Sequence, residues 1–441
     1  MNLKKPKIAI IGLGYVGLPL ALEFGKIHDV VGFDVDSNKI KNLNNLVNIP
    51  FEITKQDLLR AKFLSLTTKS LNLSSCNFYI ITVPTPVNSK NKPDLSFLKN
   101  ASETVARLLE PGNFVIYEST VYPGLSRRFC VPILEKISGL KCIQSENDIP
   151  NDSGFHLGYS PERINPGDNN NSLVNVVKVT SGSSIYSAKI IDDLYKSIIK
   201  AGTFSASSIE VAEASKILEN TQRDVNIAFM NEMAQFFQIM GIDTNDVLKA
   251  ASTKWNFIKF SPGFVGGHCI GVDPYYLISA FEKIGLKSPL IDLARSINEN
   301  MAYYAADKIL MMMKKNNSDL PSQKIGLFGF TFKDDCKDIR NSKIYDLYLE
   351  FYKNGCIIDI IDPIADPHEV MSEYGIQLIT PDENRKYDVL IFAVCHKEFT
   401  NYSIDYLLGL YSKNYRPILA DLKSIFDKKL LEKSGFDIFR L

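Results

Sequence analysis

Short apolar runs alternate with helical patterns along the first part of the chain. The runs at 7–11, 30–36, 78–86 and 114–120 are rich in Ile, Val and Phe, and each stops at glycine, acid or proline. Short continuous apolar runs between such stops are typical of strands buried on both faces of a parallel sheet. Strands that alternate with helices predict a doubly wound α/β sheet.

The pattern changes near Ser207. Residues 207–241 contain helix-forming residues throughout, no proline, and a glycine at the end. They predict a single helix of roughly 30 residues, much longer than the ~11-residue average. Helical patterns continue at 243–252 and 273–313. We expect so long a helix to join domains or to pack against a second subunit.

A second α/β pattern follows the polar stretch 316–323. It predicts strands that end in polar residues or proline, at 324–332, 357–363, 387–394 and 417–422. The expected fold is therefore α/β, with two Rossmann-like domains joined by a long central helix and a small helical domain. The expected boundaries are 1–205 for the N-terminal domain, 206–315 for the central helical domain and 316–441 for the C-terminal domain.

Composition supports this division and narrows the class of protein. A chain of 441 residues exceeds what one hydrophobic core usually serves. Its formal net charge of zero argues against nucleic acid or an anionic membrane as a partner. The seven cysteines are odd in number and form no CxxC pair, which favours reduced thiols. No apolar stretch reaches membrane-spanning length, and glycines interrupt the apolar start, so we expect a cytoplasmic enzyme.

The loop Gly12-Leu13-Gly14-Tyr15-Val16-Gly17 lies between a predicted strand and a predicted helix. In a dinucleotide-binding turn its glycines allow the tight bend, the approach of a diphosphate and close helix–strand packing. Asp34 ends the next strand, where its carboxylate accepts hydrogen bonds from ribose hydroxyls and disfavours the extra phosphate of NADP. The alternative is a glycine-rich turn that binds nothing. We predict an NAD site.

Cys269 lies in the segment Gly266–Pro274, after two glycines. If a helix begins nearby, its N-terminus would stabilise a thiolate, and Asp273 would share a helical face with Cys269. A free cysteine is, however, usually a buried structural residue. Local sequence therefore leaves Cys269 undecided between a nucleophile and a buried thiol. The adjacent His268 receives no role.

Lys216, Asn220 and Arg223 recur on one face of the long helix. The first two would donate hydrogen bonds to a developing oxyanion, and Arg223 would bind an acidic group. The alternative is a solvated face that carries pairs such as Glu219–Arg223.

The segment 330–342 follows the first strand of the second α/β pattern, at the edge where such folds bind ligands. Lys333 and Arg340 are suited to phosphate groups. The alternative is a surface loop of mixed charge.

Together these motifs resemble the UDP-glucose/GDP-mannose dehydrogenase superfamily along nearly the whole chain. The most specific match is GGHCIGVDPYYL at 266–277, supported by 12–17, 83–86, 118–124 and 330–342. The resemblance implies two Rossmann-like domains, a central helix that also forms a homodimer, and an NAD-dependent oxidation of a nucleotide-sugar alcohol to its acid. It implies no metal.

The resemblance also implies residue roles. Cys269 would be the nucleophile, Lys216 and Asn220 would polarise the reacting oxygen, Asp273 would orient water, and Thr120 and Glu162 would lie by the reacting carbon. The implied cofactor contacts are Gly12, Gly14, Tyr15, Val16, Gly17, Asp34, Lys39, Thr85, Thr120 and Arg340. The implied substrate contacts are Glu162, Arg163, Ile164, Lys216, Asn220, Arg223, Asn256, Phe257, Gly266, Phe332 and Lys333.

The segment GYSPERINPGD at 158–168 bears on the sugar. UDP-glucose dehydrogenases carry a second glutamate where Pro166 stands, whereas PER-x-x-PG resembles enzymes acting on UDP-N-acetylhexosamines. We predict four-electron oxidation of UDP-N-acetyl-D-glucosamine at C6, through a thiohemiacetal and a thioester on Cys269, for surface polysaccharide synthesis. The galactosamine and mannosamine isomers stay open. So do a single-step dehydrogenase of the 6-phosphogluconate or 3-hydroxyacyl-CoA type and a non-catalytic nucleotide sensor.

Overall fold

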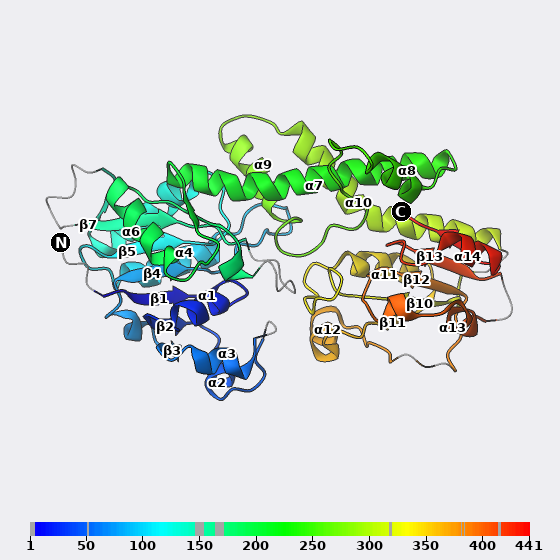
Figure 1. Ribbon diagram of the computed structural model, residues 1–441, viewed down its shortest axis with the longest axis horizontal. Helices are drawn as coiled ribbons and strands as arrows, with labels where there is room; N and C mark the ends of the chain where they lie inside the picture. The colour runs from blue at the N-terminus through cyan, green and yellow to red at the C-terminus, as the bar shows by residue number, and fades with distance from the viewer. Residues whose placement is uncertain are drawn as a thin grey trace. The chain divides into compact units, whose positions relative to one another are not determined.

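The computed structural model describes residues 5–50, 53–145, 154–163, 172–316, 320–380, 382, 384–412 and 416–441. The chain divides into two compact units. The first unit comprises Met1–Glu219 and Tyr275–Leu286, and the second comprises Asn220–Pro274 and Lys287–Leu441. The boundary falls inside one long helix, α7, which runs over Ile209–Ile239 (Figure 1).

A seven-stranded parallel sheet forms the centre of the first unit, in the order β3-β2-β1-β4-β5-β7-β6. In the register, Ile8 pairs with Val30 on one side and Phe78 on the other. The central strands are apolar on both faces because helices cover the sheet on both sides. The strand bounds are β1 Lys7–Ile11, β2 Asp29–Phe33, β3 Leu64–Thr67, β4 Phe78–Ile81, β5 Phe114–Tyr117, β6 Lys141–Ile143 and β7 Gly154–Tyr159.

Local sequence signals begin and end the helices of this unit. Asp36 caps α2 by accepting from the backbone of Asn38 and Lys39, and a capping box at Ser184 begins α6. Gly139, with φ 74°, ends α5 in the left-handed conformation. The helix bounds are α1 Gly17–Phe24, α2 Ser37–Asn44, α3 Lys55–Arg60, α4 Ser96–Ala106, α5 Val131–Ser138 and α6 Ile185–Lys196, with a small ladder of β8 Lys178–Thr180 and β9 Thr203–Ser205.

The single helix expected from Ser207 onward is confirmed, since α7 has 31 residues. The helical pattern at 273–313 is broken into two helices, α9 Asp273–Lys283 and α10 Pro289–Lys315. The break is at Gly285, whose φ of 75° is unsuited to a helix, and Pro289 then begins α10. Within the second unit, the Asn231 amide of α7 donates to Asn298 of α10 at 2.8 Å.

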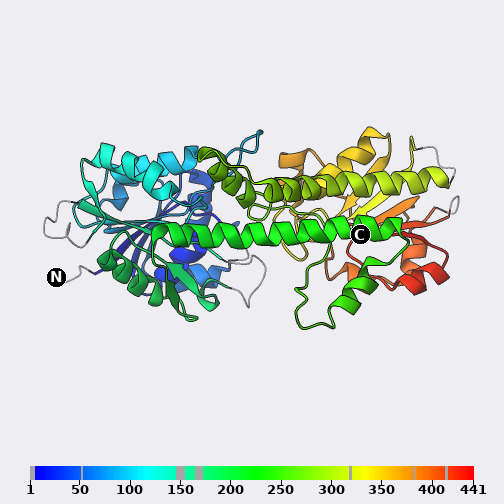
Figure 2. The ribbon, with the colours of Figure 1, turned by 90° about the horizontal axis from the view of Figure 1, so that it is seen from above.

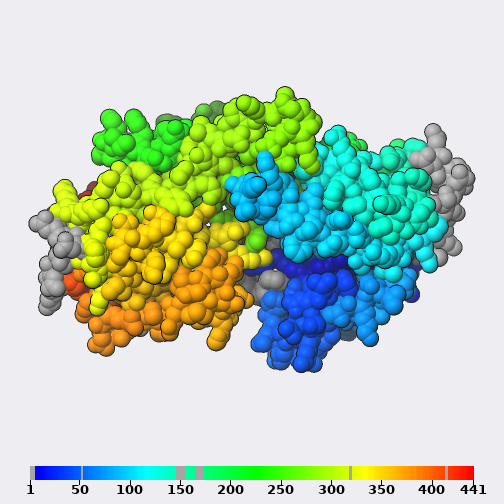
Figure 3. All heavy atoms as spheres, turned by 180° about the vertical axis from the view of Figure 1, so that it is seen from behind, coloured from blue at the N-terminus to red at the C-terminus, as the bar shows by residue number. Residues whose placement is uncertain are grey.

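The second unit contains a five-stranded parallel sheet in the order β11-β10-β12-β13-β14. Its buried core joins Leu327 and Ile391 of the sheet to Ile309 of α10. Figure 2 shows α10 alongside this sheet, and Figure 3 shows one face of the molecule in space-filling form, with the residues of this unit coloured from green to red. The bounds are α8 Thr244–Ala251, β10 Lys324–Phe328, α11 Lys343–Lys353, β11 Ile357–Ile361, α12 Pro367–Tyr374, β12 Val389–Phe392, α13 Ile404–Gly409, β13 Ile418–Asp421, α14 Lys428–Lys433 and β14 Asp437–Phe439.

The predicted α/β class and all eight predicted strands are present, although most are shorter than the apolar runs that predicted them. The predictions missed β3, β6, β7, β8, β9 and β14, which are short or contain polar residues and glycine. For example, β7, with the sequence GFHLGY, is buried along its whole length although its own sequence has no continuous apolar pattern.

Candidate active site

The first unit presents its glycine-rich loop at the point where the sheet changes winding direction. The loops after β1 and β4, which are neighbours in the sheet, meet here, and such points are where doubly wound folds bind ligands. Gly12 has φ 95°, and a Cβ on Gly17 would lie 1.8 Å from the Gly12 carbonyl oxygen. The Thr82 hydroxyl donates to that carbonyl at 2.7 Å, so the loop after β4 stabilises the turn.

The same loop leaves room for a diphosphate. A Cβ built on Gly14 would meet nothing within 4 Å, and no side chain caps the N-terminus of α1. The loop therefore has space for an anion at the N-terminus of α1, where the helix dipole favours negative charge. Tyr15 and Val16 are half-buried in the turn, and Thr85 is half-buried in the β4 loop. These residues fit the diphosphate of NAD.

Asp34 lies at the end of β2, buried against the glycine-rich loop. Its carboxylate accepts from the backbone of Leu13 and Asp36 and from the Lys39 ammonium, each at 2.9 Å. Burial alone would raise the pKa of Asp34, but these hydrogen bonds together lower it. The carboxylate is therefore ionised at neutral pH and suited to accept from ribose hydroxyls.

Thr120 follows β5, and Glu162 follows β7, so both lie at the same edge of the sheet as the glycine-rich loop. The Lys216 ammonium on α7 donates to the Thr120 hydroxyl at 2.5 Å. Oε1 of Glu162 is buried and has no hydrogen-bond partner among the described residues. Burial raises the pKa of Glu162 to about 7, although Lys216 and Lys178 oppose the rise. A carboxyl group with this pKa exchanges protons at neutral pH.

The residues next to Glu162 are only partly described. Arg163 forms an ion pair with Glu219 of α7. Ile164 and Pro166 lie outside the described residues. The substrate role predicted for Arg163 stays a prediction.

In the second unit, Cys269 lies in a turn over 267–272 that leads into α9. Asp273 is the first residue of that helix, so the prediction that Cys269 and Asp273 share a helical face is wrong. Instead, the Asp273 backbone N–H donates to the Cys269 carbonyl at 2.8 Å and closes the turn. All seven cysteines are described, and Cys269 is the exposed one. The alternative of a buried structural thiol is thereby excluded.

Asn220 and Asp273 form a buried pair in the same unit. The Asn220 amide donates to the Asp273 carboxylate at 2.6 Å, and both side chains are almost fully buried. This hydrogen bond connects α7 to the first residue of α9, which directly follows the turn that contains Cys269. Arg223, one turn further along α7, is exposed.

The segment before Cys269 packs on the loop that follows β10. A Cβ on Gly266 would lie 2.6 Å from the Asn341 carbonyl oxygen, so only glycine permits this approach. Phe332 lies against Gly266 and Gly267, and the Lys333 ammonium lies 5.7 Å from the Phe332 ring centroid. Asn256 is exposed and Phe257 is half-buried on the segment that leads into this packing.

A small pocket opens where these segments meet the carboxyl edge of the second sheet. Three lysines line it, Lys333, Lys343 and Lys423, and the Lys343 ammonium is paired with Glu299 and Asp346. Lysines of this kind bind phosphate groups. The Arg340 guanidinium, predicted to contact the cofactor, binds Asp338 through two hydrogen bonds of 2.8 and 2.6 Å. The remaining lining residues are Phe264, Gly266, Phe332, Ser342, Ile344, Ala393 and Val394.

Sequence reasoning missed several buried polar groups near these edges. Glu118 accepts from the Lys178 ammonium at 2.7 Å and from the Tyr195 hydroxyl, directly beside the strand end that carries Thr120. Glu118 belongs to a motif that the sequence analysis quoted, but its partner Lys178 has no local signal. His396 and Asp362 of the second unit had none either.

Among the described residues, no cluster of three or more His, Cys, Asp or Glu side chains is arranged to hold a metal ion. No described helix combines the length and apolar character needed to cross a membrane.

Several known proteins are similar to this chain in both sequence and fold. Models of the UDP-glucose/GDP-mannose dehydrogenase family match residues 6–199 (NAD binding domain), 210–300 (central domain) and 326–428 (UDP binding domain). A relative from Salmonella typhi named UDP-N-acetyl-D-glucosamine 6-dehydrogenase is 48% identical over 95% of this chain and 96% of its own. One of the same name from Pseudomonas aeruginosa is 45% identical over 97% and 98%. The solved UDP-D-ManNAc dehydrogenase of Pyrococcus horikoshii has a TM-score of 0.87, 30% identity and 98% coverage of both chains.

Proposed function

Because the chain belongs to the UDP-glucose/GDP-mannose dehydrogenase family, we propose that it oxidises C6 of UDP-N-acetyl-D-glucosamine to a carboxylate. It is an NAD-dependent oxidoreductase, since this is a dehydrogenase family with an NAD-binding domain and a UDP-binding domain. The observation that carries the proposal is the exposed thiol of Cys269, in the turn that precedes the buried Asn220–Asp273 pair.

The residues of the first unit would serve the cofactor and the reacting carbon. Gly14 and Asp34 would hold the diphosphate and the ribose of NAD⁺, which when bound supplies the acceptor for the hydride that leaves C6 in each of two oxidations. The Lys216 ammonium and the Thr120 hydroxyl would polarise the C6 oxygen, because both are hydrogen-bond donors and are already bonded to each other.

Cys269 would hold the aldehyde covalently. Its thiolate adds to the aldehyde carbon to give a thiohemiacetal, and oxidation of that adduct leaves a thioester. An exposed thiol is required, since a buried one cannot reach a substrate. Asn220 would stabilise the oxyanion of the adduct. Asp273, which accepts from Asn220, would orient the amide and the attacking water.

Hydrolysis of the thioester needs a base. The Glu162 carboxyl, with its pKa raised to about 7, can take a proton from water at neutral pH. The water oxygen then attacks the thioester carbonyl carbon, and the carbon–sulfur bond breaks, so that Cys269 is released as a thiolate. The acid product loses its remaining proton to solvent and is released as the carboxylate. Arg163, Arg223, Asn256, Phe257, Gly266, Phe332 and Lys333 are the proposed contacts to the rest of the UDP-sugar, with Lys39, Thr85 and Arg340 on the cofactor.

The choice of sugar rests on relatedness. The two bacterial relatives described above are named for UDP-N-acetyl-D-glucosamine and are much more similar to this chain than the solved UDP-D-ManNAc dehydrogenase. UDP-N-acetyl-D-galactosamine and UDP-N-acetyl-D-mannosamine are the alternatives, since each differs from the proposed substrate at one stereocentre. The product would be a UDP-N-acetylhexosaminuronic acid, a precursor for surface polysaccharides.

An NADH assay against a panel of nucleotide sugars tests the proposal. UDP-N-acetyl-D-glucosamine is expected to give two molecules of NADH per sugar, with UDP-glucose and GDP-mannose as negative controls. A higher kcat/KM for either isomer would reassign the sugar. One NADH per sugar would point to a single-step dehydrogenase, and no turnover with any sugar would support a nucleotide sensor.

Assembly and location are also part of the proposal. We infer three domains over 1–205, 206–315 and 316–441, and a homodimer formed through the central helix. We also propose a cytoplasmic location. No disulfide joins any of the seven cysteines, and reduced cysteines are typical of cytoplasmic proteins.

A further inference from the structure

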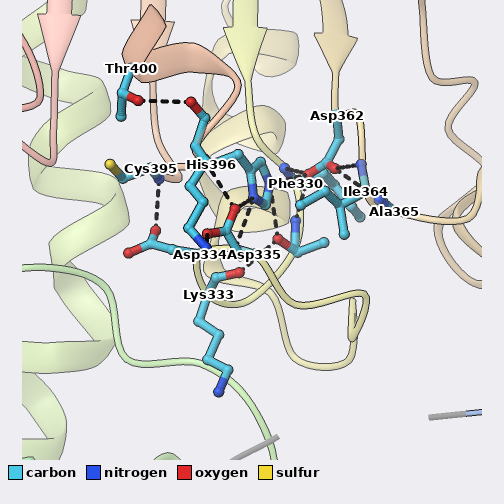
Figure 4. Close-up of polar contacts among 12 residues, drawn as sticks. Phe330, Lys333, Asp334, Asp335, Asp362, Ile364, Ala365, Cys395, His396 and Thr400 are labelled. Carbon is cyan, nitrogen blue, oxygen red and sulfur yellow. Dashed lines mark hydrogen bonds and ion pairs between the residues drawn. The ribbon is translucent and has the colours of Figure 1, made fainter. Parts of the chain in front are cut away.

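His396 lies in the loop after β12 of the second unit and is fully buried. Its ring faces two segments that are distant in the sequence, the loop after β10 and the end of β11 (Figure 4). β10 and β12 are neighbours in the sheet, and the winding direction changes between them, so these loops flank the ligand-binding edge. The histidine therefore sits beneath that edge.

The hydrogen bonds assign one tautomer to this ring. The backbone N–H of Asp335 donates to Nδ1 at 3.0 Å, so Nδ1 must carry a lone pair. The proton is then on Nε2, which lies 3.1 Å from the Asp362 carboxylate and 3.3 Å from the Thr331 hydroxyl. The Thr331 hydroxyl in turn donates to the Lys333 carbonyl at 3.0 Å. One neutral ring thus bonds residues on both sides of Lys333.

Asp362 holds the other side of the ring. Its carboxylate accepts from the backbone of Phe330 at 2.6 Å and Thr331 at 3.1 Å, and from Ile364 and Ala365 at 2.8 Å. Burial would raise the pKa of Asp362, but His396 and these N–H groups lower it to about 2. An ionised Asp362 joins the first residues of the β10 loop to the end of β11.

The loop itself has an unfavourable backbone that these contacts maintain. Asp335 has φ 52°, a left-handed conformation that residues other than glycine rarely adopt. The Asp334 carboxylate accepts from the backbone N–H of Cys395 at 2.7 Å, and the Asp335 carboxylate accepts from the backbone N–H of Lys397 at 3.0 Å. Both acids next to Lys333 are therefore engaged with the β12 loop. In Figure 4 the Lys333 side chain points away from this cluster.

We propose that His396, through Asp362 and the backbone of Asp335, is a positioning residue that holds Lys333 for the diphosphate of the UDP-sugar. This inference rests on the proposed function, because it assigns the ligand of the Lys333 pocket. Lys333 lines that pocket from a loop that is bonded on both sides by one ring. Removing the ring releases the loop without removing any group that contacts the substrate.

His396→Leu in the full-length enzyme tests the proposal. We expect KM for the UDP-sugar and Kd for UDP, measured by calorimetry, to rise about tenfold, the effect of one weakened charge-assisted contact, while kcat and the KM for NAD stay within about twofold. H396Q keeps a donor toward Asp362, and H396N keeps an acceptor for Asp335. Each is expected to restore part of the UDP affinity.

Two controls separate positioning from a general loss of structure. Leu407→Ala removes a fully buried side chain of α13 in the same unit and is expected to lower the Tm while leaving Kd for UDP unchanged. In a Lys333→Ala background, His396→Leu should weaken UDP binding by less than about twofold, because coupled residues are not additive.

Four outcomes would overturn the proposal. They are an unchanged Kd for UDP in folded H396L, equal losses with and without Lys333, a loss of UDP affinity in L407A as large as in H396L, and a wild-type protein that does not bind UDP. A wild-type protein that binds UDP yet does not oxidise UDP-N-acetyl-D-glucosamine would overturn the proposed function alone, and the UDP titrations would still decide the role of His396.

Discussion

The seven cysteines of this protein show how the environment of a thiol sets its reactivity. Burial raises the pKa of Cys76 and Cys356 to about 11 and of Cys130 to about 12, which keeps these thiols protonated and inert. Cys269 is exposed in a turn closed by its own carbonyl group. The site proposed for covalent chemistry is therefore also the thiol that an external reagent meets first.

Cys269→Ser should lower the rate of NADH formation on the order of 10³-fold, because an oxygen nucleophile neither captures the aldehyde nor forms a labile ester as a thiolate does. Stopped-flow and steady-state NADH absorbance measure this rate. Cys142→Ala, which removes a buried thiol at the edge of the first sheet, is the matched control and should retain kcat. Normal production of two NADH per sugar by C269S would exclude the covalent role.

Glu162 should give kcat an acidic limb. A base acts in its deprotonated form, so kcat is expected to rise with pH through the pKa of about 7. Glu162→Gln should remove that limb and lower kcat at pH 8 roughly 10²- to 10⁴-fold, the usual contribution of a general base. A pH profile of kcat from pH 5.5 to 9 measures both effects, and an unchanged limb in E162Q would assign it to another group.

The same raised pKa has a consequence for stability. The folded state favours protonated Glu162, so this stabilisation is complete below about pH 4.5 and is lost as the pH rises through about 7. Glu162→Gln stays neutral at every pH. It should raise the free energy of unfolding on the order of 1–3 kcal/mol at pH 8 and leave it unchanged near pH 4.5, as urea titrations would measure.

At the scale of elements, both sheets place a glycine after one strand and an aspartate after the neighbouring strand, but the two aspartates have different partners. Gly12 after β1 and Gly329 after β10 both have φ above 90°, at 95° and 92°. Asp34 after β2 accepts from the β1 loop, and Asp362 after β11 accepts from the β10 loop. The first acid is proposed to bind ribose, whereas the second is occupied by His396 and the backbone.

Alanine at two glycines of one loop should differ in its effect on stability. A Cβ on Gly17 would lie 1.8 Å from the Gly12 carbonyl oxygen, so Gly17→Ala should lower stability by about 1–3 kcal/mol and weaken NAD binding. A Cβ on Gly14 meets no protein atom within 4 Å. Gly14→Ala should therefore keep the wild-type Tm and still raise the KM for NAD, because the methyl group occupies space proposed for the diphosphate.

Differential scanning fluorimetry and NAD kinetics measure both variants. A wild-type KM for NAD in a folded G14A protein would remove this loop from the cofactor site. The KM for the UDP-sugar is the internal reference and should change little in G14A.

At the scale of the whole molecule, α7 carries large apolar side chains that are exposed in the single chain. Phe229 and Phe236 lie two helical turns apart on the same face and are 53% and 50% exposed. Large apolar side chains grouped on one helix face usually mark an interaction surface. This face supports the proposed homodimer through the central helix.

Light scattering after gel filtration should give the mass of two chains. Phe229→Asp combined with Phe236→Asp should shift the mass toward one chain, because charges on a buried apolar interface are strongly unfavourable. Phe97→Asp, at an equally exposed site on α4 of the first unit, should leave the mass unchanged. A wild-type protein with the mass of one chain would exclude the dimer.

The sequence alone determined what depends on neighbouring residues: the apolar runs that became strands, the length of α7, the glycine-rich turn and Asp34 at its fixed distance. Their signals are local, since periodicity and turn chemistry operate over a few residues. Only the tertiary structure decided that Cys269 is exposed, that Glu118 meets Lys178 across 60 positions, and that His396 meets Asp362 across 34. Strand order brings such side chains together, and no local pattern records which strand ends will be neighbours.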